Sequence, residues 1–221
     1  MWRRGLPGLL FAVFATFAVT TLCSAQTASK VDTSAPDALI RSLSQDILDT
    51  ARNDPAVKAG DINRINQLVN EKLLPYADFE HTTRLAMGRY WRQATDTQKQ
   101  QLIEQFKLLL VHTYAGATSK IGDQSVTVKP LHVAPGDTDV VVHSEIDSQG
   151  KAYPVDYRMQ QTPTGWKIYD VNVLNVWLVA TYRSQFSSVI QQQGIDGLIA
   201  SLTQRNADLA ARGNLAASAN K

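Results

Sequence analysis

Apolar residues recur at helical spacing along the first third of the chain. One stripe, over residues 36–52, consists of Leu39, Ile40, Leu43, Ile47 and Leu48. A second stripe follows the helix start signal Gly60-Asp61 and consists of Ile62, Ile65, Leu68, Val69 and Leu73. Residues at these spacings share one face of a helix, so the pattern predicts two amphipathic helices. A third helix is expected over residues 75–87, ending near Gly88.

A longer helix is predicted from Asp96 to about Lys120, with Thr95-Asp96 as its N-terminal cap. Its apolar positions include Leu102, Ile103, Phe106, Leu109, Leu110 and Val111. These positions cover more than half of the helix circumference. We therefore expect this helix to be largely buried.

Beyond Gly122 the period of the apolar positions changes from near four to two. Three turn segments, Pro135-Gly136-Asp137, Ser148-Gln149-Gly150 and Pro163-Thr164-Gly165, separate four alternating runs, which predicts an antiparallel meander. If the hairpins pair in register, one sheet face carries Leu131, Val133, Val140, Val142, Ile146, Tyr153, Val155, Tyr157 and Met159. Helices followed by a sheet favour the α+β fold class.

Helical spacing returns after the fourth strand. One stripe consists of Leu178, Val179, Tyr182, Phe186, Val189 and Ile190, and Arg183, Ser184 and Ser187 lie off it. A helix of this kind buries its stripe and exposes its polar back. It does not direct a serine and an arginine at one reacting atom.

The N-terminal residues MWRRGLPGLLFAVFATFAVTTLCSA carry two arginines, an apolar run and small residues at the end. This is the pattern of a secretory signal peptide over residues 1–25, cleaved near Ala25. We expect a flexible N-terminus over residues 26–35, a single domain over residues 36–210 and a flexible tail over residues 211–221.

Charge and cysteine content exclude several function classes. The chain has 22 basic and 20 acidic residues, and cleavage after Ala25 removes two arginines and the single cysteine. The remaining chain is formally neutral, which gives no bulk attraction to nucleic acid. Without cysteine it can form neither a disulfide nor a thiolate zinc site.

Catalytic and metal-binding patterns are weak. The chain has no Gly-x-Ser-x-Gly motif, and Asp78, Glu80 and His81 would point to different faces of a helix, so we expect neither a catalytic serine nor a metal site. General acid–base catalysis by Asp156, Asp170 and Tyr157 inside a cavity of sheet and helices is the more serious enzyme interpretation.

Two segments resemble one known family. They are DVNVLNVWLVATYRSQFSSVIQQQGIDGLIASLTQRN and, upstream, FEHTTRLAMGRYWRQATDTQKQQLIEQFKLLLVHTYA, in which Arg84, Gly88 and Trp91 match an Arg-x-x-x-Gly-x-x-Trp pattern. Both resemble the MlaC family, also called the toluene-tolerance auxiliary family. The resemblance covers roughly residues 36–206, and the two segments together are more specific than either alone.

This resemblance implies both a fold and a function. The implied fold is an NTF2-like curved antiparallel sheet of about four strands, with N-terminal and C-terminal helices enclosing an apolar cavity. The implied function is that of a periplasmic carrier holding phospholipid acyl chains, with no catalytic residue and no cofactor apart from the phospholipid cargo. The implied partners are an outer-membrane lipoprotein–porin complex and an inner-membrane ABC transporter with an MCE substrate-binding subunit, between which lipid would pass to maintain outer-membrane lipid asymmetry.

The lipid-binding residues expected for such a cavity come from the helical stripes and the sheet face. They are Phe106, Leu109, Leu110, Val140, Val142, Tyr157, Val173, Leu178, Val179, Tyr182 and Phe186. The chain has Asn175-Val176-Trp177 where the family often has Gly-Val-Ser, and we expect Trp177 to fill part of the cavity or to lie across its mouth. Two alternatives stay open: an exported NTF2-like enzyme acting on a small hydrophobic substrate, and an interaction module with a filled core.

Overall fold

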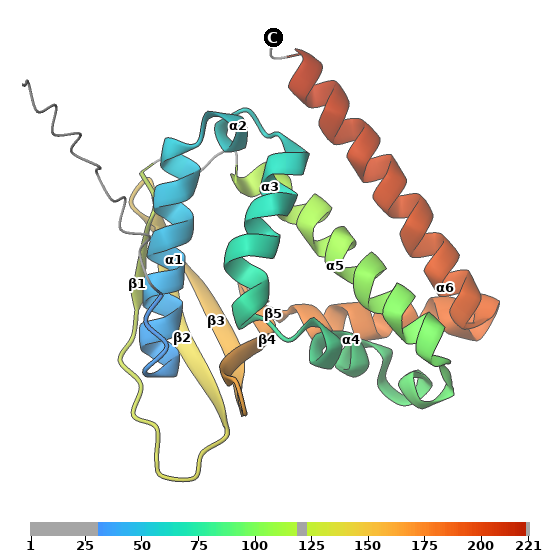
Figure 1. The fold of residues 1–221 in the computed structure, drawn as a ribbon, viewed down its shortest axis with the longest axis horizontal. Coiled ribbons are helices and arrows are strands. Elements are labelled where there is room, and N and C mark those ends of the chain that lie inside the picture. The colour runs from blue at the N-terminus through green and yellow to red at the C-terminus, as the bar shows by residue number, and fades with distance from the viewer. Residues whose placement is uncertain (1–30, 119–122, 220–221) are drawn as a thin grey trace, which may run out of the picture. The chain divides into compact units, whose positions relative to one another are not determined.

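The computed structural model describes residues 31–118 and 123–219 (Figure 1). The predicted signal peptide lies outside the described residues, as do residues 26–30 and 220–221. The helical segments are α1 (Pro36–Asn53), α2 (Pro55–Lys58), α3 (Ile62–Leu68), η1 (Val69–Leu73), η2 (Leu74–Tyr76), α4 (Phe79–Met87), η3 (Gly88–Gln93), α5 (Asp96–Thr118) and α6 (Leu178–Ala219). The strands are β1 (Ser125–Val128), β2 (Asp139–Ser148), β3 (Lys151–Thr162), β4 (Gly165–Val173) and β5 (Val176–Trp177).

Local capping residues explain where the N-terminal helices begin. Pro36 occupies the first turn of α1, where a missing N–H costs nothing. The Asp54 carboxylate accepts hydrogen bonds from two backbone amides of α2, and Asp61 does the same for α3. The third predicted helix begins later than expected, at Phe79, because Asp78 accepts a hydrogen bond from the His81 amide and thereby caps α4 there.

The sheet confirms the predicted meander and its register. Its order is β1-β2-β3-β4-β5 with every pair antiparallel, and Val140 pairs with Met159 while Val142 pairs with Tyr157. The first strand is shorter than predicted because it ends at Val128, before Pro130, whose nitrogen cannot donate to a ladder. The fifth strand was not predicted, and the left-handed turn residues Leu174 (φ 52°) and Asn175 (φ 66°) join it to β4.

Three apolar clusters form the core of the part of the chain that the structure describes. The bundle cluster, from α4, α5 and α6, includes Ala86, Met87, Leu102, Phe106, Leu109, Tyr182, Phe186 and Leu198. The sheet cluster, where α1 covers the sheet, includes Leu39, Ile40, Leu43, Val128, Val142, Met159, Trp166 and Ile168. The small cluster consists of Ala51, Val57, Ile65 and Val111. A domain of this size usually has one continuous core, so the division into three is a feature to explain.

Helix α6 bends sharply and returns beside α5 (Figure 1). The bend is at Gly194, whose φ of 73° and ψ of −176° are not helical and suit glycine. Beyond the bend, the Asn206 side chain donates a hydrogen bond of 2.9 Å to the Gln105 carbonyl oxygen of α5. The helix extends to Ala219, through most of the segment for which the sequence predicts a flexible tail.

Gly88 ends α4 in a backbone conformation that only glycine adopts without strain, with φ 55° and ψ −127°. A Cβ atom there would lie 3.0 Å from Nε of Arg183 on α6. We expect Gly88→Ala to lower the free energy of unfolding by about 1–3 kcal/mol, measured by chemical denaturation. Gly150→Ala is the matched control, because Gly150 also has a positive φ of 75° but no atom lies within 4 Å of the place its Cβ would take. Equal losses in the two variants would contradict a role for the Arg183 contact.

Candidate functional site

An apolar pocket of about 320 Å³ lies where the three clusters meet. Its lining consists of Ile47, Thr50, Ala51, Val57, Ile65, Leu68, Val69, Lys72, Leu73, Phe79, Leu110, Val111, Val171 and Leu178. The small cluster forms much of the wall, the sheet cluster contributes residues such as Val171, and the bundle cluster contributes Leu110 and Leu178. The core is therefore divided because the clusters face a common space.

The size and lining of the pocket suit apolar groups. Thr50 and Lys72 carry the polar side chains of the lining, and its other members are aliphatic or aromatic. At about 24 cal/mol per Å³, filling 320 Å³ with close-packed apolar atoms contributes about 8 kcal/mol. That is comparable to the whole stability of an ordinary domain, roughly 5–15 kcal/mol. An apolar ligand would thus bind with a large driving force.

The polar edge of the pocket is formed by α1 and η1. Nζ of Lys72 donates hydrogen bonds to both carboxylate oxygens of Asp46, at 2.8 and 2.6 Å. The Thr50 hydroxyl donates to the Asp46 backbone oxygen at 2.7 Å. The side chains of Lys72 and Asp46 are 28% and 14% exposed, so the pair lies between the apolar interior and solvent.

Two of the predicted lipid-binding residues, Leu110 and Leu178, line the pocket. Four others, Phe106, Leu109, Tyr182 and Phe186, pack with one another in the bundle cluster. Val140, Val142 and Tyr157 belong to the sheet cluster. Val173 pairs with Val155 and Val176 in the sheet, and Val179 borders a separate concavity. Of the eleven predicted residues, the structure thus brings two into the lining of the pocket.

Most of the lining comes from α1, α2, α3 and η1. The sequence predicts α1 and the segment of α3 and η1 only as amphipathic helices, and it does not predict α2. The helical spacing of Ile65, Leu68, Val69, Lys72 and Leu73 does contain a signal. Lys72 occupies a position of the stripe where an apolar residue is expected. A lysine on the apolar face of a helix can indicate that the helix lines a pocket and that the pocket is open to solvent at one edge.

The proposed acid–base residues do not form one site. Adjacent strand residues point to opposite sheet faces, and Tyr157 pairs with Val142 and Val171 on the apolar face, away from Asp156 and Asp170. Asp170, which is 3% exposed, accepts hydrogen bonds from the amides of Val171 and Val179, at 2.9 and 3.0 Å. Burial raises the pKa of the Asp170 carboxyl despite these bonds. Its contacts hold the start of α6 against β4.

The polar back of α6 borders a second concavity, together with α4 and β3. Its lining includes Arg158, Arg183 and the serines 184, 187 and 188. The Ser187 hydroxyl accepts a hydrogen bond of 3.1 Å from the Gln191 side chain. These serines lie on the outer face of the helix, as the periodicity predicts.

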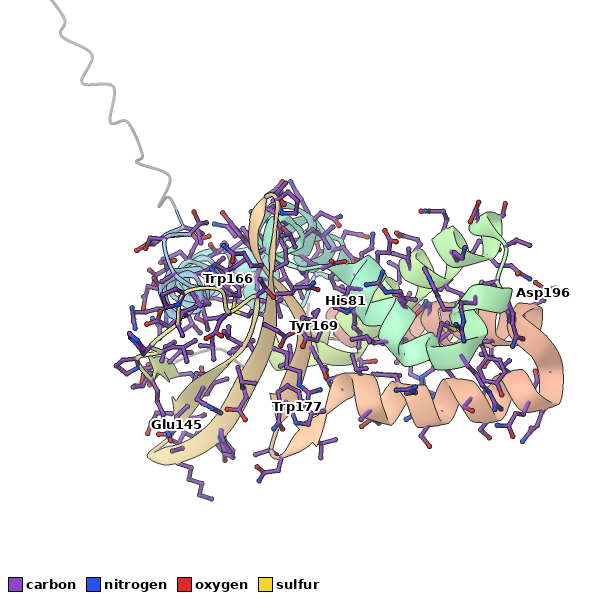
Figure 2. The ribbon with its side chains drawn as sticks, turned by 90° about the horizontal axis from the view of Figure 1, so that it is seen from below. His81, Glu145, Trp166, Tyr169, Trp177 and Asp196 are labelled. Atoms are coloured by element: carbon purple, nitrogen blue, oxygen red, sulfur yellow. The ribbon has the colours of Figure 1, made fainter. Side chains whose placement is uncertain are left out.

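Trp177 lies at the junction of the sheet and α6 (Figure 2). The Arg158 guanidinium carbon is 3.9 Å from the centre of its indole ring, a cation–π contact. Trp177 is not part of the pocket lining, so the structure does not support the expectation that it fills the cavity. The contact with Arg158 holds the indole against the outer, polar face of the sheet.

His81 stacks on Tyr169, with the ring centres 4.6 Å apart, and both are labelled in Figure 2. Burial lowers the pKa of His81, and nearby Arg84 lowers it further. Burial and a hydrogen bond to Asp139 raise the pKa of Tyr169 to about 12, so this phenol stays neutral at physiological pH. Asp78 caps α4, and the residues that the structure describes contain no group of three His, Cys, Asp or Glu arranged to hold a metal ion.

The lowered histidine pKa predicts loss of stability in mild acid. The unfolded chain binds a proton on His81 near pH 6.5, whereas the folded chain resists it, so stability is present above about pH 6.5 and is lost as pH falls toward the folded pKa. We expect the melting temperature of the wild type to fall between pH 7.5 and pH 5. His81→Phe, which keeps the ring stack, should show a smaller fall. The same fall in both proteins would contradict this assignment.

The comparisons with known proteins bear on this geometry. The family model described as "MlaC protein" matches residues 41–204, a segment that runs from α1 through most of α6 and includes every element of the pocket. The chain belongs to the MlaC family. The match confirms the resemblance seen in the two sequence segments.

Two curated MlaC relatives extend the comparison. The "Toluene tolerance protein ttg2D" of Pseudomonas putida is 27% identical over 195 residues, which cover 88% of this chain and 85% of the relative. The "Intermembrane phospholipid transport system binding protein MlaC" of Haemophilus influenzae is 22% identical over 160 residues, which cover 71% of this chain and 74% of the relative.

A solved structure of similar fold contains a bound ligand. The phospholipid-binding protein from Ralstonia solanacearum, solved in complex with a phospholipid, matches with a TM-score of 0.75 and 44% identity. The match covers 77% of this chain and 96% of that chain. The α+β class and the open antiparallel sheet with flanking helices are thus shown for this MlaC family member. In the described part of the chain, no helix combines the length and hydropathy of a transmembrane span.

Proposed function

We propose that this protein is a periplasmic phospholipid carrier that encloses acyl chains in the apolar pocket at the junction of its three clusters. The observation that carries the proposal is this pocket, about 320 Å³ in volume and lined almost wholly by apolar side chains. It gains support from the Ralstonia solanacearum protein, which has a similar fold and binds a phospholipid. No catalytic residue, metal or cofactor is part of the proposal.

The energy of acyl-chain burial explains why such a carrier needs an enclosed site. At about 0.8 kcal/mol per methylene, two chains of about sixteen carbons cost on the order of 25 kcal/mol to expose to water. The pocket volume of about 320 Å³ is near the lower end of the range for sites that enclose small ligands, about 300–1,000 Å³, whereas a diacyl phospholipid carries two long chains. A diacyl phospholipid therefore requires the walls to separate.

The division of the core into three clusters favours such a separation. The clusters can move apart along the pocket without any one of them losing its internal packing. We infer that Leu110 and Leu178 contact lipid in the narrow pocket. The other nine predicted residues would support the walls of the site rather than contact lipid, because they lie within the clusters, in the sheet or at the second concavity: Phe106, Leu109, Val140, Val142, Tyr157, Val173, Val179, Tyr182 and Phe186.

The carrier proposal includes the wider pathway. The protein would shuttle phospholipid between an outer-membrane lipoprotein–porin complex and an inner-membrane ABC transporter with an MCE substrate-binding subunit, and so maintain outer-membrane lipid asymmetry. Support comes from membership of the MlaC family and from the name of the Haemophilus influenzae relative, which places that protein in intermembrane phospholipid transport. Export to the periplasm rests on the signal pattern of residues 1–25.

The test is to purify the protein from cells without detergent, extract it with organic solvent and quantify the extract by mass spectrometry. We expect diacyl phospholipid at a near-integer molar ratio to protein. Well-folded protein that yields no lipid, and binds none when it is offered in vesicles, would overturn the proposal and favour an interaction module.

A further inference from the structure

The polar edge of the apolar pocket is the Lys72–Asp46 pair, and its chemistry goes beyond acyl-chain burial. We propose that Lys72 binds the head group of the carried phospholipid, with its ammonium donating a hydrogen bond to an oxygen of the phosphodiester. This assignment rests on the proposed carrier function and adds to it the end of the pocket at which the phosphate lies.

Lys72 lies on the face of its helix that lines the pocket. Residues Ile65, Leu68, Val69, Lys72 and Leu73 all line the pocket, because they share one face of α3 and its continuation η1. The Lys72 side chain lines apolar space, is 28% exposed and pairs through its ammonium with Asp46, so it combines an apolar stem with a charged end. A phospholipid has the same division, with apolar chains joined to a charged phosphodiester.

The Lys72 ammonium has more hydrogen-bond donors than its bonds to Asp46 require. A lysine ammonium carries three N–H donors. Two of them are used by the Asp46 carboxylate oxygens, at 2.8 and 2.6 Å. The third is left for an anionic oxygen, and the carboxylate holds Nζ in a fixed place at the pocket edge.

The charge balance of the pair bears on which ligands it selects. Lys72 and Asp46 together are neutral, so the pair has little long-range attraction for anions in solution. A free inorganic phosphate would gain one hydrogen bond and no burial of apolar area. A phospholipid gains both, because its chains fill the apolar pocket next to the ammonium.

The test compares two ligands with identical acyl chains in delipidated protein: phosphatidylglycerol, which has the phosphodiester, and diacylglycerol, which lacks it. Lys72→Met removes the charge and keeps an apolar stem. We expect this variant to bind phosphatidylglycerol about tenfold more weakly, the typical effect of one charge-assisted hydrogen bond, and to bind diacylglycerol as the wild type does. Lys72→Arg, which keeps the charge, should recover most of the affinity.

Lys129→Met is the matched control. Nζ of Lys129 forms a similar ion pair with Glu145 at 2.8 Å, but it lies on the sheet and outside the pocket lining. This variant should bind both ligands as the wild type does. Asp46→Asn is a second probe, because it removes the competing carboxylate charge and should strengthen phosphatidylglycerol binding rather than weaken it.

Four results would overturn the assignment of Lys72 while leaving the carrier function intact. Equal losses for both ligands in Lys72→Met would mean that the ion pair only supports the wall, as would weaker binding in Asp46→Asn. Unchanged binding of both ligands would place the head group elsewhere. Competition by millimolar inorganic phosphate would indicate a free-anion site. Failure of the wild type to bind either ligand would instead overturn the carrier function itself.

Discussion

Replacing Val171 with tryptophan should weaken phospholipid binding by roughly fiftyfold and leave the protein folded. Val171 is a half-buried residue of β4 whose side chain lines the pocket at the margin of the sheet cluster. If the larger indole displaces about three acyl methylenes, the binding free energy falls by about 2.4 kcal/mol, which corresponds to that factor. The indole has room to turn into the pocket, so the strand register need not change.

The measurement is the dissociation constant for a diacyl phospholipid, with the unfolding transition recorded on the same sample. Val176→Trp is the matched control because it makes the same change on β5, where Val176 is 52% exposed and outside the pocket lining. It should bind lipid as the wild type does. A folded Val171→Trp variant with wild-type affinity would show that the acyl chains lie elsewhere.

Much of the fold follows from local patterns in the sequence. The stripes of α1 and α5 and the alternating residues of β2 and β3 predict these elements because each pattern has the period of its structure. The periodicity predicts neither the start of α4 at Phe79 nor the end of β1 at Val128. Each depends on a single local feature: the carboxylate cap by Asp78 for α4, and the missing N–H of Pro130 for β1. Such local features can end or delay an element that the periodicity would continue. The spacing of apolar residues alone does not show where this happens.

The site was less predictable than the fold. Phe106 and Leu110 lie one helical turn apart on α5, yet Phe106 is buried in the bundle cluster and Leu110 lines the pocket. Both meet the same sequence criterion, because burial against a side chain and burial against a cavity require the same apolar residue. The distinction depends on how three separate clusters approach one another. This approach is a property of tertiary packing, and it cannot be predicted from the apolar positions of any single helix or strand.

Phe106 offers the test that separates these two kinds of burial. Its side chain is fully buried, and its ring contacts those of Tyr182 and Phe186 edge to face, with centres 4.8 and 5.0 Å away. Truncation removes both aromatic contacts and leaves a cavity within packed neighbours. We expect Phe106→Ala to lower the free energy of unfolding by about 3–5 kcal/mol, a large part of the stability of a domain.

Chemical denaturation of delipidated protein gives this value, and lipid binding is measured under conditions where the variant is folded. Leu174→Ala is the control, because Leu174 is 54% exposed and its truncation should change stability by less than about 0.5 kcal/mol. If Phe106 serves mainly to hold α5 against α6, lipid affinity in the folded variant should change far less than stability. The opposite result, lost lipid binding with little loss of stability, would mean that the aromatic cluster opens to the acyl chains and that Phe106 is part of the lipid site itself.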